Sequence, residues 1–152
     1  MKKYYLAYGS NLNLQQLNSR CKAHLIGTTI LENYQLVYKG SCDGYAYLTI
    51  EKKEGSYVPL GVFKISKFDE LLLDKYEGYP KLYSKKYVPL DINHKRYKAL
   101  IYVMNEEFDY HLPSGEYIKS CRQGYFDFRF DQRILNNALE ETIKNLPKKL
   151  IK

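Results

Sequence analysis

Tryptophan is absent from the 152 residues, cysteine occurs only three times, and no long apolar run is present. A membrane-spanning helix needs roughly 18 or more consecutive apolar residues, so the sequence predicts no membrane segment. The N-terminus carries two lysines but only a brief apolar stretch before Gly9, which is too short for a secretory signal. We therefore expect a cytoplasmic protein.

The cysteines are odd in number and far apart, and they never form a Cys-x-x-Cys pair; they are Cys21, Cys42 and Cys121. This spacing excludes a disulfide framework and favours three small apolar side chains in a reducing compartment. The histidines are equally isolated, so we interpret them as surface or boundary residues; they are His24, His94 and His111. The sequence therefore predicts no metal site and no cofactor.

A formal net charge of +7 would allow contact with nucleic acid. The basic residues are scattered among acidic ones, however, and no recognised nucleic-acid motif is present. The 17 tyrosines could stack on bases, but they are also typical of the rims of a half-buried sheet, which is the interpretation we favour. We expect no nucleic-acid partner.

Strand-like stretches fill the first two-thirds of the chain, where aromatic and β-branched residues alternate with polar ones. They are Lys3–Tyr8, Ala23–Thr29, Tyr34–Tyr38, Tyr45–Ile50, Val58–Ile65, Tyr87–Ile92 and Tyr97–Met104. Short turns separate them, which favours antiparallel pairing over a doubly wound parallel sheet. Pro59 fits near the start of its strand, where a missing N–H does least harm.

Helices are predicted where capping residues precede apolar residues at helical spacing. The caps are Asn13, Ser66, Ser114 and Asp131. The second helix has an apolar stripe of Phe68, Leu71, Leu72 and Tyr76 and ends at Gly78, and the last helix has one of Ile134, Leu135, Leu139 and Ile143. We predict the α+β class: a small, mixed, mainly antiparallel β-barrel with flanking helices, in a single domain over residues 1–152.

The segment Tyr8-Gly9-Ser10-Asn11-Leu12 lies between a predicted strand and a predicted helix. Gly9 permits backbone conformations that other residues avoid, and the N–H groups that follow approach a helix start. Unpaired donors of this kind can hold a carboxylate or a developing oxyanion. An ordinary strand–turn–helix connection explains the same residues.

Glu77 lies at the end of its predicted helix, where the helix dipole disfavours a negative charge. Tyr76, Tyr79 and Pro80 flank it and could shield it from water. Both effects raise the pKa of a carboxylate, as suits a group that takes and returns a proton near neutral pH. Asp74 lies one turn earlier on the same face, so the two side chains could form a pair of carboxylates. The simpler interpretation is that both are solvated acids at the end of a surface helix.

Tyr117 follows Pro113 and Ser114 at the start of a predicted helix. Its ring with a polar tip fits either the edge of the core or a ligand-facing position. The segment alone leaves both possibilities open.

Taken in order, these segments resemble the gamma-glutamyl cyclotransferase family. The Tyr8–Leu12 segment resembles the family's Tyr-Gly-Ser-Asn loop, and Asp74-x-x-Glu77-Gly78 followed by Tyr83 resembles the segment with its catalytic glutamate. Pro113-Ser114-x-x-Tyr117 is similar to the late segment whose tyrosine lines the pocket. Tyr79-Pro80 is similar to the short bacterial and plant-like (AIG2-like) branches, which leaves the substrate open.

The resemblance implies a metal-independent enzyme without a cofactor that cyclises a gamma-glutamyl amine or amino acid to 5-oxoproline and releases the free amine. It implies Glu77 as the catalytic proton carrier and assigns substrate binding to Tyr5, Tyr8, Gly9, Ser10, Asn11, Leu12 and Tyr117. The expected partner is a small gamma-glutamyl compound, and the expected assembly is a monomer or homodimer. The alternatives are a binding protein that keeps the pocket without turnover and a basic nucleic-acid-binding module.

Overall fold

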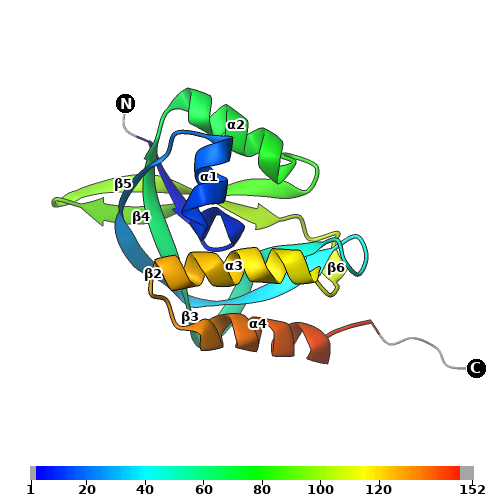
Figure 1. Ribbon diagram of the computed structural model, residues 1–152. Coiled ribbons are helices and arrows are strands. Elements are labelled where there is room, and N and C mark those ends of the chain that lie inside the picture. Colours follow the sequence, from blue (N-terminus) through cyan, green and yellow to red (C-terminus); the bar gives the residue numbers. More distant parts are fainter. Residues whose placement is uncertain (1–2, 148–152) are drawn as a thin grey trace, which may run out of the picture.

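The computed structural model describes residues 3–147, and residues 1–2 and 148–152 of the predicted domain lie outside the described part. The strands are β1 (Lys3–Ala7), β2 (His24–Gly40), β3 (Ala46–Ile65), β4 (Tyr83–Ile92), β5 (Lys95–Met104) and β6 (Asp109–Tyr110). The helices are α1 (Leu14–Arg20), α2 (Lys67–Glu77), α3 (Gly115–Asp127) and α4 (Gln132–Lys144), with a 3-10 turn η1 (Ser10–Leu12) between β1 and α1. Helices α1 and α2 lie at one end of a curled sheet, and α3 and α4 lie at the other (Figure 1).

The sheet has the strand order β4-β5-β1-β3-β2-β6. Only β1 and β5 run parallel among the described pairs, with Tyr5 opposite Leu100, and the other pairs are antiparallel. The predicted α+β class with a mixed, mainly antiparallel sheet is confirmed. The sheet curls into a half-barrel (Figure 1), and β1 is an interior strand of it, between β5 and β3. The loop that follows β1 therefore begins within the sheet and not at its edge.

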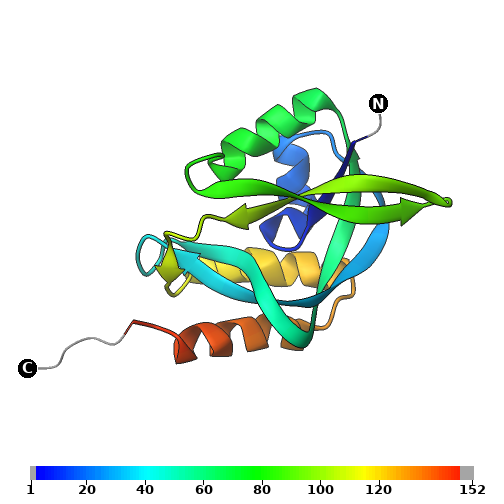
Figure 2. The same ribbon diagram turned by 180° about the vertical axis from the view of Figure 1, so that it is seen from behind.

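Strands β2 and β3 form one long hairpin, which Figure 2 shows curving around the molecule. The sequence predicted four shorter strands here, and that prediction is wrong. The chain stays paired through a bulge in which Asn33 takes a left-handed conformation with a φ of 64° and accepts a hydrogen bond of 3.1 Å from the Gly55 N–H. Such a bulge bends a strand without ending it. Pro59 accordingly lies within β3, two residues before the pairing with β1 begins at Gly61.

All the predicted helix caps are confirmed: the Asn13, Ser66, Ser114 and Asp131 side chains each accept a backbone N–H of the first helical turn. The predicted apolar stripe of α2 is wrong for Phe68 and Leu71, which are 68% and 59% exposed, whereas Leu72 packs against the core as predicted. The buried side is turned towards Asp69, because its carboxylate accepts the N–H groups of Ser66 and Lys22 at 2.9 and 3.0 Å. The buried side of α2 therefore carries a satisfied carboxylate, Asp69, together with Leu73.

In α4 the prediction is wrong for Ile143, which is 53% exposed. Thr142 is buried in its place, because its hydroxyl accepts the Tyr38 N–H at 2.8 Å and donates to the Ala138 carbonyl at 2.7 Å. Leu135 is buried as predicted. The helix is thus joined to β2 by a hydrogen bond as well as by apolar contacts.

Cys21 and Cys121 are buried, but Cys42 is exposed, which corrects the prediction that all three are apolar fillers. The histidines occupy exposed or half-buried positions, as predicted. Within residues 3–147, no helix is long and apolar enough to cross a membrane, and no group of three His, Cys, Asp or Glu side chains is arranged to hold a metal ion.

Gly124 allows α3 to pack directly on the turn after β1. A Cβ atom at Gly124 would lie 2.7 Å from the backbone nitrogen of Asn13 and 2.7 Å from the carbonyl carbon of Leu12. Carbon and nitrogen atoms cannot approach so closely, and neither neighbour is a movable side chain. The close contact fixes the distance between α3 and the loop that opens at the centre of the sheet.

We predict that Gly124→Ala lowers the free energy of unfolding by about 1–3 kcal/mol, because the added methyl group forces α3 away from the turn. Gly115→Ala is the matched control, since the space around Gly115 is open. Urea unfolding of the two variants checks this prediction. Equal stability of Gly124→Ala and the parent would contradict the close contact.

Candidate active site

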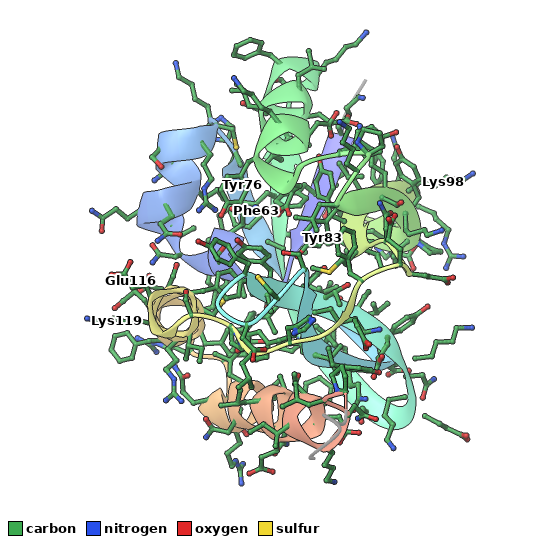
Figure 3. The ribbon with its side chains drawn as sticks, turned by 90° about the vertical axis from the view of Figure 1, so that its right-hand side faces the viewer. Phe63, Tyr76, Tyr83, Lys98, Glu116 and Lys119 are labelled. Carbon is green, nitrogen blue, oxygen red and sulfur yellow. The ribbon has the colours of Figure 1, made fainter. Side chains whose placement is uncertain are left out.

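A cavity of about 210 Å³ opens where the turn after β1, the end of α2, α3 and the four strands β1, β3, β4 and β5 meet. Figure 3 shows Tyr76 and Tyr83 at this place, between α2 at the top and α3 at the lower left. The lining residues are Tyr5, Leu6, Tyr8, Gly9, Ser10, Asn11, Tyr47, Leu48, Tyr76, Glu77, Leu82, Tyr83, Tyr102 and Tyr117. Half of them are tyrosines, so the interpretation of tyrosine as a residue of sheet rims is wrong for these seven.

The turn after β1 contributes backbone donors to the cavity wall. Within residues 3–147, no hydrogen bond uses the N–H groups of Gly9, Ser10 or Asn11. Gly9 lies close to the opposite wall, because a Cβ atom there would be 3.2 Å from the Tyr117 hydroxyl. Three consecutive N–H groups with free hydrogen-bonding capacity can bind an anion or a polarised carbonyl oxygen.

Glu77 is the last residue of α2 and is followed by Gly78, which ends the helix in the left-handed conformation with a φ of 66°. Its Oε1 atom lies 3.3 Å from Nδ2 of Asn11. Burial raises the pKa of Glu77 from its ordinary value of 4.5 to about 7, and the positive charge of Arg20 acts in the opposite direction. The carboxyl group can therefore gain and lose a proton near neutral pH.

The shielding of Glu77 differs from the prediction. Tyr76 lines the cavity, but Tyr79 and Pro80 are exposed and lie outside it. The walls come instead from the sheet and the first turn; these tyrosines are Tyr5, Tyr8, Tyr83 and Tyr102. The residues that follow Glu77 in sequence do not shield it, because the chain leaves the cavity after Gly78.

Asp74 does not pair with Glu77. Its Oδ1 atom accepts the Tyr102 hydroxyl at 2.6 Å, and its Oδ2 atom accepts Nζ of Lys85 at 2.8 Å. Lys85 also donates to Glu70 at 2.7 Å. Both oxygens of Asp74 are thus occupied outside the cavity wall, and the paired-carboxylate alternative is not supported.

Tyr117 extends from α3 to the cavity wall and also packs against the edge of the core, so it occupies both of the positions that the sequence allowed. Its hydroxyl oxygen accepts the backbone N–H of Leu48 at 3.0 Å, and the Tyr83 hydroxyl donates to the Leu48 carbonyl at 2.7 Å. A tyrosine hydroxyl can accept and donate at once. Cys121, one turn later in α3, accepts a hydrogen bond from the Tyr117 hydroxyl. A ligand acceptor in the cavity can take the place of this sulfur.

The remaining predicted residues divide between cavity and core. Tyr5 accepts Nδ2 of Asn11 at 2.7 Å, and Tyr8 donates to the Tyr102 carbonyl at 2.6 Å. Leu12 has no exposed surface, does not line the cavity, and donates its N–H to the Gly9 carbonyl at 3.0 Å. The prediction that Leu12 binds the substrate is corrected accordingly: it belongs to the core.

Sequence reasoning gave no role to three tyrosines of the cavity, Tyr47, Tyr83 and Tyr102. Tyr83 follows Glu77 within the segment that resembles the family, so its place in that motif could have predicted a position near the cavity. Tyr47 and Tyr102 lie in β3 and β5, which are not neighbours in the sheet order. No local signal brings two such residues together, because their proximity depends on how the sheet curls.

Solved structures with the same fold include a gamma-glutamyl cyclotransferase, with a TM-score of 0.71 and 23% identity over 100% of this chain and 92% of the other. YkqA from Bacillus subtilis has a TM-score of 0.71 and 18% identity over 97% of this chain and 56% of YkqA. A yeast gamma-glutamyl cyclotransferase specific to glutathione has a TM-score of 0.61 and 13% identity over 95% and 99%. These likenesses define the gamma-glutamyl cyclotransferase-like fold.

The family model described as gamma-glutamyl cyclotransferase, AIG2-like, matches residues 5–119. The chain therefore belongs to this family, and the resemblance stated from its motifs is confirmed. No curated protein matches the sequence.

The raised pKa of Glu77 predicts how stability depends on pH. Because the folded state holds the proton more tightly than the unfolded state, the parent loses stability as the pH rises from about 4.5 through 7. Glu77→Gln removes this titration, so its free energy of unfolding should exceed that of the parent at pH 8, by at most about 3 kcal/mol. The difference should vanish below about pH 4.5.

Glu107→Gln makes the same chemical change on an exposed carboxylate and serves as the control. Chemical unfolding of the parent and both variants at several pH values measures the effect. A Glu77→Gln difference that is constant with pH would contradict the raised pKa.

Proposed function

We propose that this protein is a gamma-glutamyl cyclotransferase-type enzyme. It converts a gamma-glutamyl amine or amino acid to 5-oxoproline and releases the free amine. The observation that carries the proposal is the Glu77 carboxyl group, with a pKa of about 7, in a small cavity beside unpaired backbone donors. Family membership supports the reaction class.

The reaction requires a proton to move twice. The α-ammonium group of the substrate must lose a proton before its nitrogen can attack the γ-carbonyl carbon, and the leaving nitrogen must then gain one. In the proposed mechanism Glu77 performs both transfers, as base and then as acid. A pKa near the working pH suits both directions, whereas an ordinary glutamate would return the proton too readily to serve as a base.

The turn after β1 supplies the complementary part of the mechanism. In our proposal the free N–H groups of Gly9, Ser10 and Asn11 hold the substrate carboxylate and stabilise the negative charge that develops on the γ-carbonyl oxygen. Tyr5 and Tyr8 shape the wall behind this turn. Holding the substrate folded brings its amine and carbonyl together, which removes much of the entropic cost of ring closure.

Tyr117 is proposed as the substrate-binding residue opposite the turn. Its hydroxyl oxygen is held in place by the Leu48 N–H. In the proposed complex its hydrogen turns from the Cys121 sulfur to a substrate acceptor. Edge-to-face contacts with Tyr38 and Tyr47, at centroid distances of 6.3 and 5.1 Å, fix the ring. The hydroxyl therefore needs little reorganisation when a ligand binds.

Glu77→Gln should abolish turnover while the protein stays folded, because the amide cannot exchange the proton. Loss of general acid–base catalysis typically costs about 10²–10⁴-fold. The measurement is release of 5-oxoproline from a panel of gamma-glutamyl amides and amino acids, which also identifies the leaving amine.

Asp74→Asn tests the neighbouring carboxylate and should keep its activity after correction for the folded fraction. A Glu77→Gln rate within about threefold of the parent would remove Glu77 from the mechanism. Tight binding of gamma-glutamyl compounds without any release by the parent would favour the binding-protein alternative.

Tyr117→Phe should affect both stability and rate. The variant leaves the Leu48 N–H without its acceptor, which lowers the free energy of unfolding by about 1–3 kcal/mol. If the hydroxyl also donates to substrate, kcat/KM should fall by roughly tenfold beyond the loss of folded protein.

Tyr125→Phe is the matched control for this change. Its hydroxyl is buried, lies outside the cavity wall and has no hydrogen-bond partner among the described residues. The control should therefore keep the parent's kcat/KM and lose no stability. A Tyr117→Phe enzyme with full kcat/KM per folded molecule would limit Tyr117 to a structural role.

A further inference from the structure

Arg20, the last residue of α1, makes three contacts beside the cavity without lining it. Its Nη1 atom donates to Oδ1 of Asn11, and its Nη2 atom donates to Oε1 of Gln16 at 3.0 Å. Its guanidinium carbon lies 3.4 Å from the ring centroid of Tyr76, a residue of the cavity wall. A planar guanidinium group can make all three contacts at once, because it has donors in its plane and a face for stacking.

The contact with Arg20 fixes which way the Asn11 amide points. An arginine only donates, so the atom that faces it must be the Asn11 oxygen. The amide nitrogen then points to the Tyr5 hydroxyl, at 2.7 Å, and to Oε1 of Glu77, at 3.3 Å. A flipped amide would place its oxygen against the Glu77 carboxylate, and both atoms would be acceptors.

We propose that Arg20 is a positioning residue for Glu77: it orients the Asn11 amide towards the carboxylate and holds the Tyr76 ring over the same side of the cavity. This inference rests on the proposed function of Glu77. Arg20 does not itself line the cavity, so its effect reaches the reaction through the wall residues Asn11 and Tyr76 and through its charge.

The groups that face Glu77 leave Arg20 as the charge that lowers its pKa. Four tyrosines face the carboxyl group, from β1, the turn after it, β4 and β5: Tyr5, Tyr8, Tyr83 and Tyr102. Burial raises the pKa of each phenol, so all four are neutral near pH 7. Asp74, on the same helix, is paired with Lys85. Arg20 is the cation whose charge favours ionised Glu77 against the effect of burial.

Two variants separate the charge of Arg20 from its geometry. Arg20→Gln removes the cation, so the titration midpoint of Glu77 should rise by about one pH unit. Arg20→Lys keeps the cation but loses the planar fork, so the midpoint should stay near that of the parent while kcat falls by about tenfold. The midpoint is read from the carboxyl ¹³C shift of Glu77, assigned with Glu77→Gln, and from the pH profile of kcat/KM.

Arg122→Gln is the control, because it removes an exposed arginine from α3 and should change neither quantity. An Arg20→Gln midpoint within about 0.2 pH unit of the parent would overturn the role of the charge. A fully active Arg20→Lys enzyme would overturn the role of the fork. A rate loss in either variant that only follows the folded fraction, measured by thermal unfolding, would reduce Arg20 to a structural residue.

The two proposals fail in different ways. If the parent releases no 5-oxoproline from any compound of the panel, the proposed function falls. The NMR titration of Glu77 in Arg20→Gln needs no turnover, so it still decides whether Arg20 controls the carboxyl group. A raised midpoint there supports the inference whatever the substrate.

Discussion

The rest of the site depends on the side-chain amide of Asn11, which links three parts of the molecule by hydrogen bonds. Its oxygen accepts a hydrogen bond from Arg20 in α1, and its nitrogen donates to Tyr5 in β1 and to Glu77 at the end of α2. A hydrogen bond donated to a carboxylate favours its charged form, while burial favours the neutral one. At 3.3 Å the bond to Glu77 is long and therefore weak. Burial raises the pKa of Glu77 to about 7, and the positive charge of Arg20 is what acts against it. The balance leaves the carboxyl group divided between its two forms at neutral pH.

The cavity exists because β3 changes partners along its length. Its second half pairs with β1 over residues 61–65, but its first half pairs only with β2 among the described strands. The backbone groups of Leu48 therefore face an opening and not a neighbouring strand. Hydroxyl groups of Tyr83 and Tyr117 take the place of the missing strand. Buried backbone groups need partners, so the tyrosines that line the cavity also hold its wall together.

Features that depend on a few consecutive residues could be predicted from the sequence, and features that depend on distant partners could not. The helix caps and the position of Glu77 at a helix end are local, and the motif order identified the family. The bulge at Asn33 required Gly55, 22 residues away, and the buried side of α2 required the N–H of Lys22 to meet Asp69. The walls around Glu77 depended on the curl of the sheet, which no short segment encodes.

The charges of the cavity also constrain how it can hold a ligand. None of the described residues that line it is Lys or Arg, and Glu77 is its one ionisable carboxylate. An anionic group in the cavity must therefore rely on N–H and hydroxyl donors, and by like-charge repulsion it would raise the pKa of Glu77 further. An ammonium group in the same ligand lowers it again. A zwitterion such as the gamma-glutamyl group brings both charges, so its binding can leave the pKa of Glu77 near 7. A simple dicarboxylate would favour the protonated carboxyl group and so block the action as a base that we propose for Glu77.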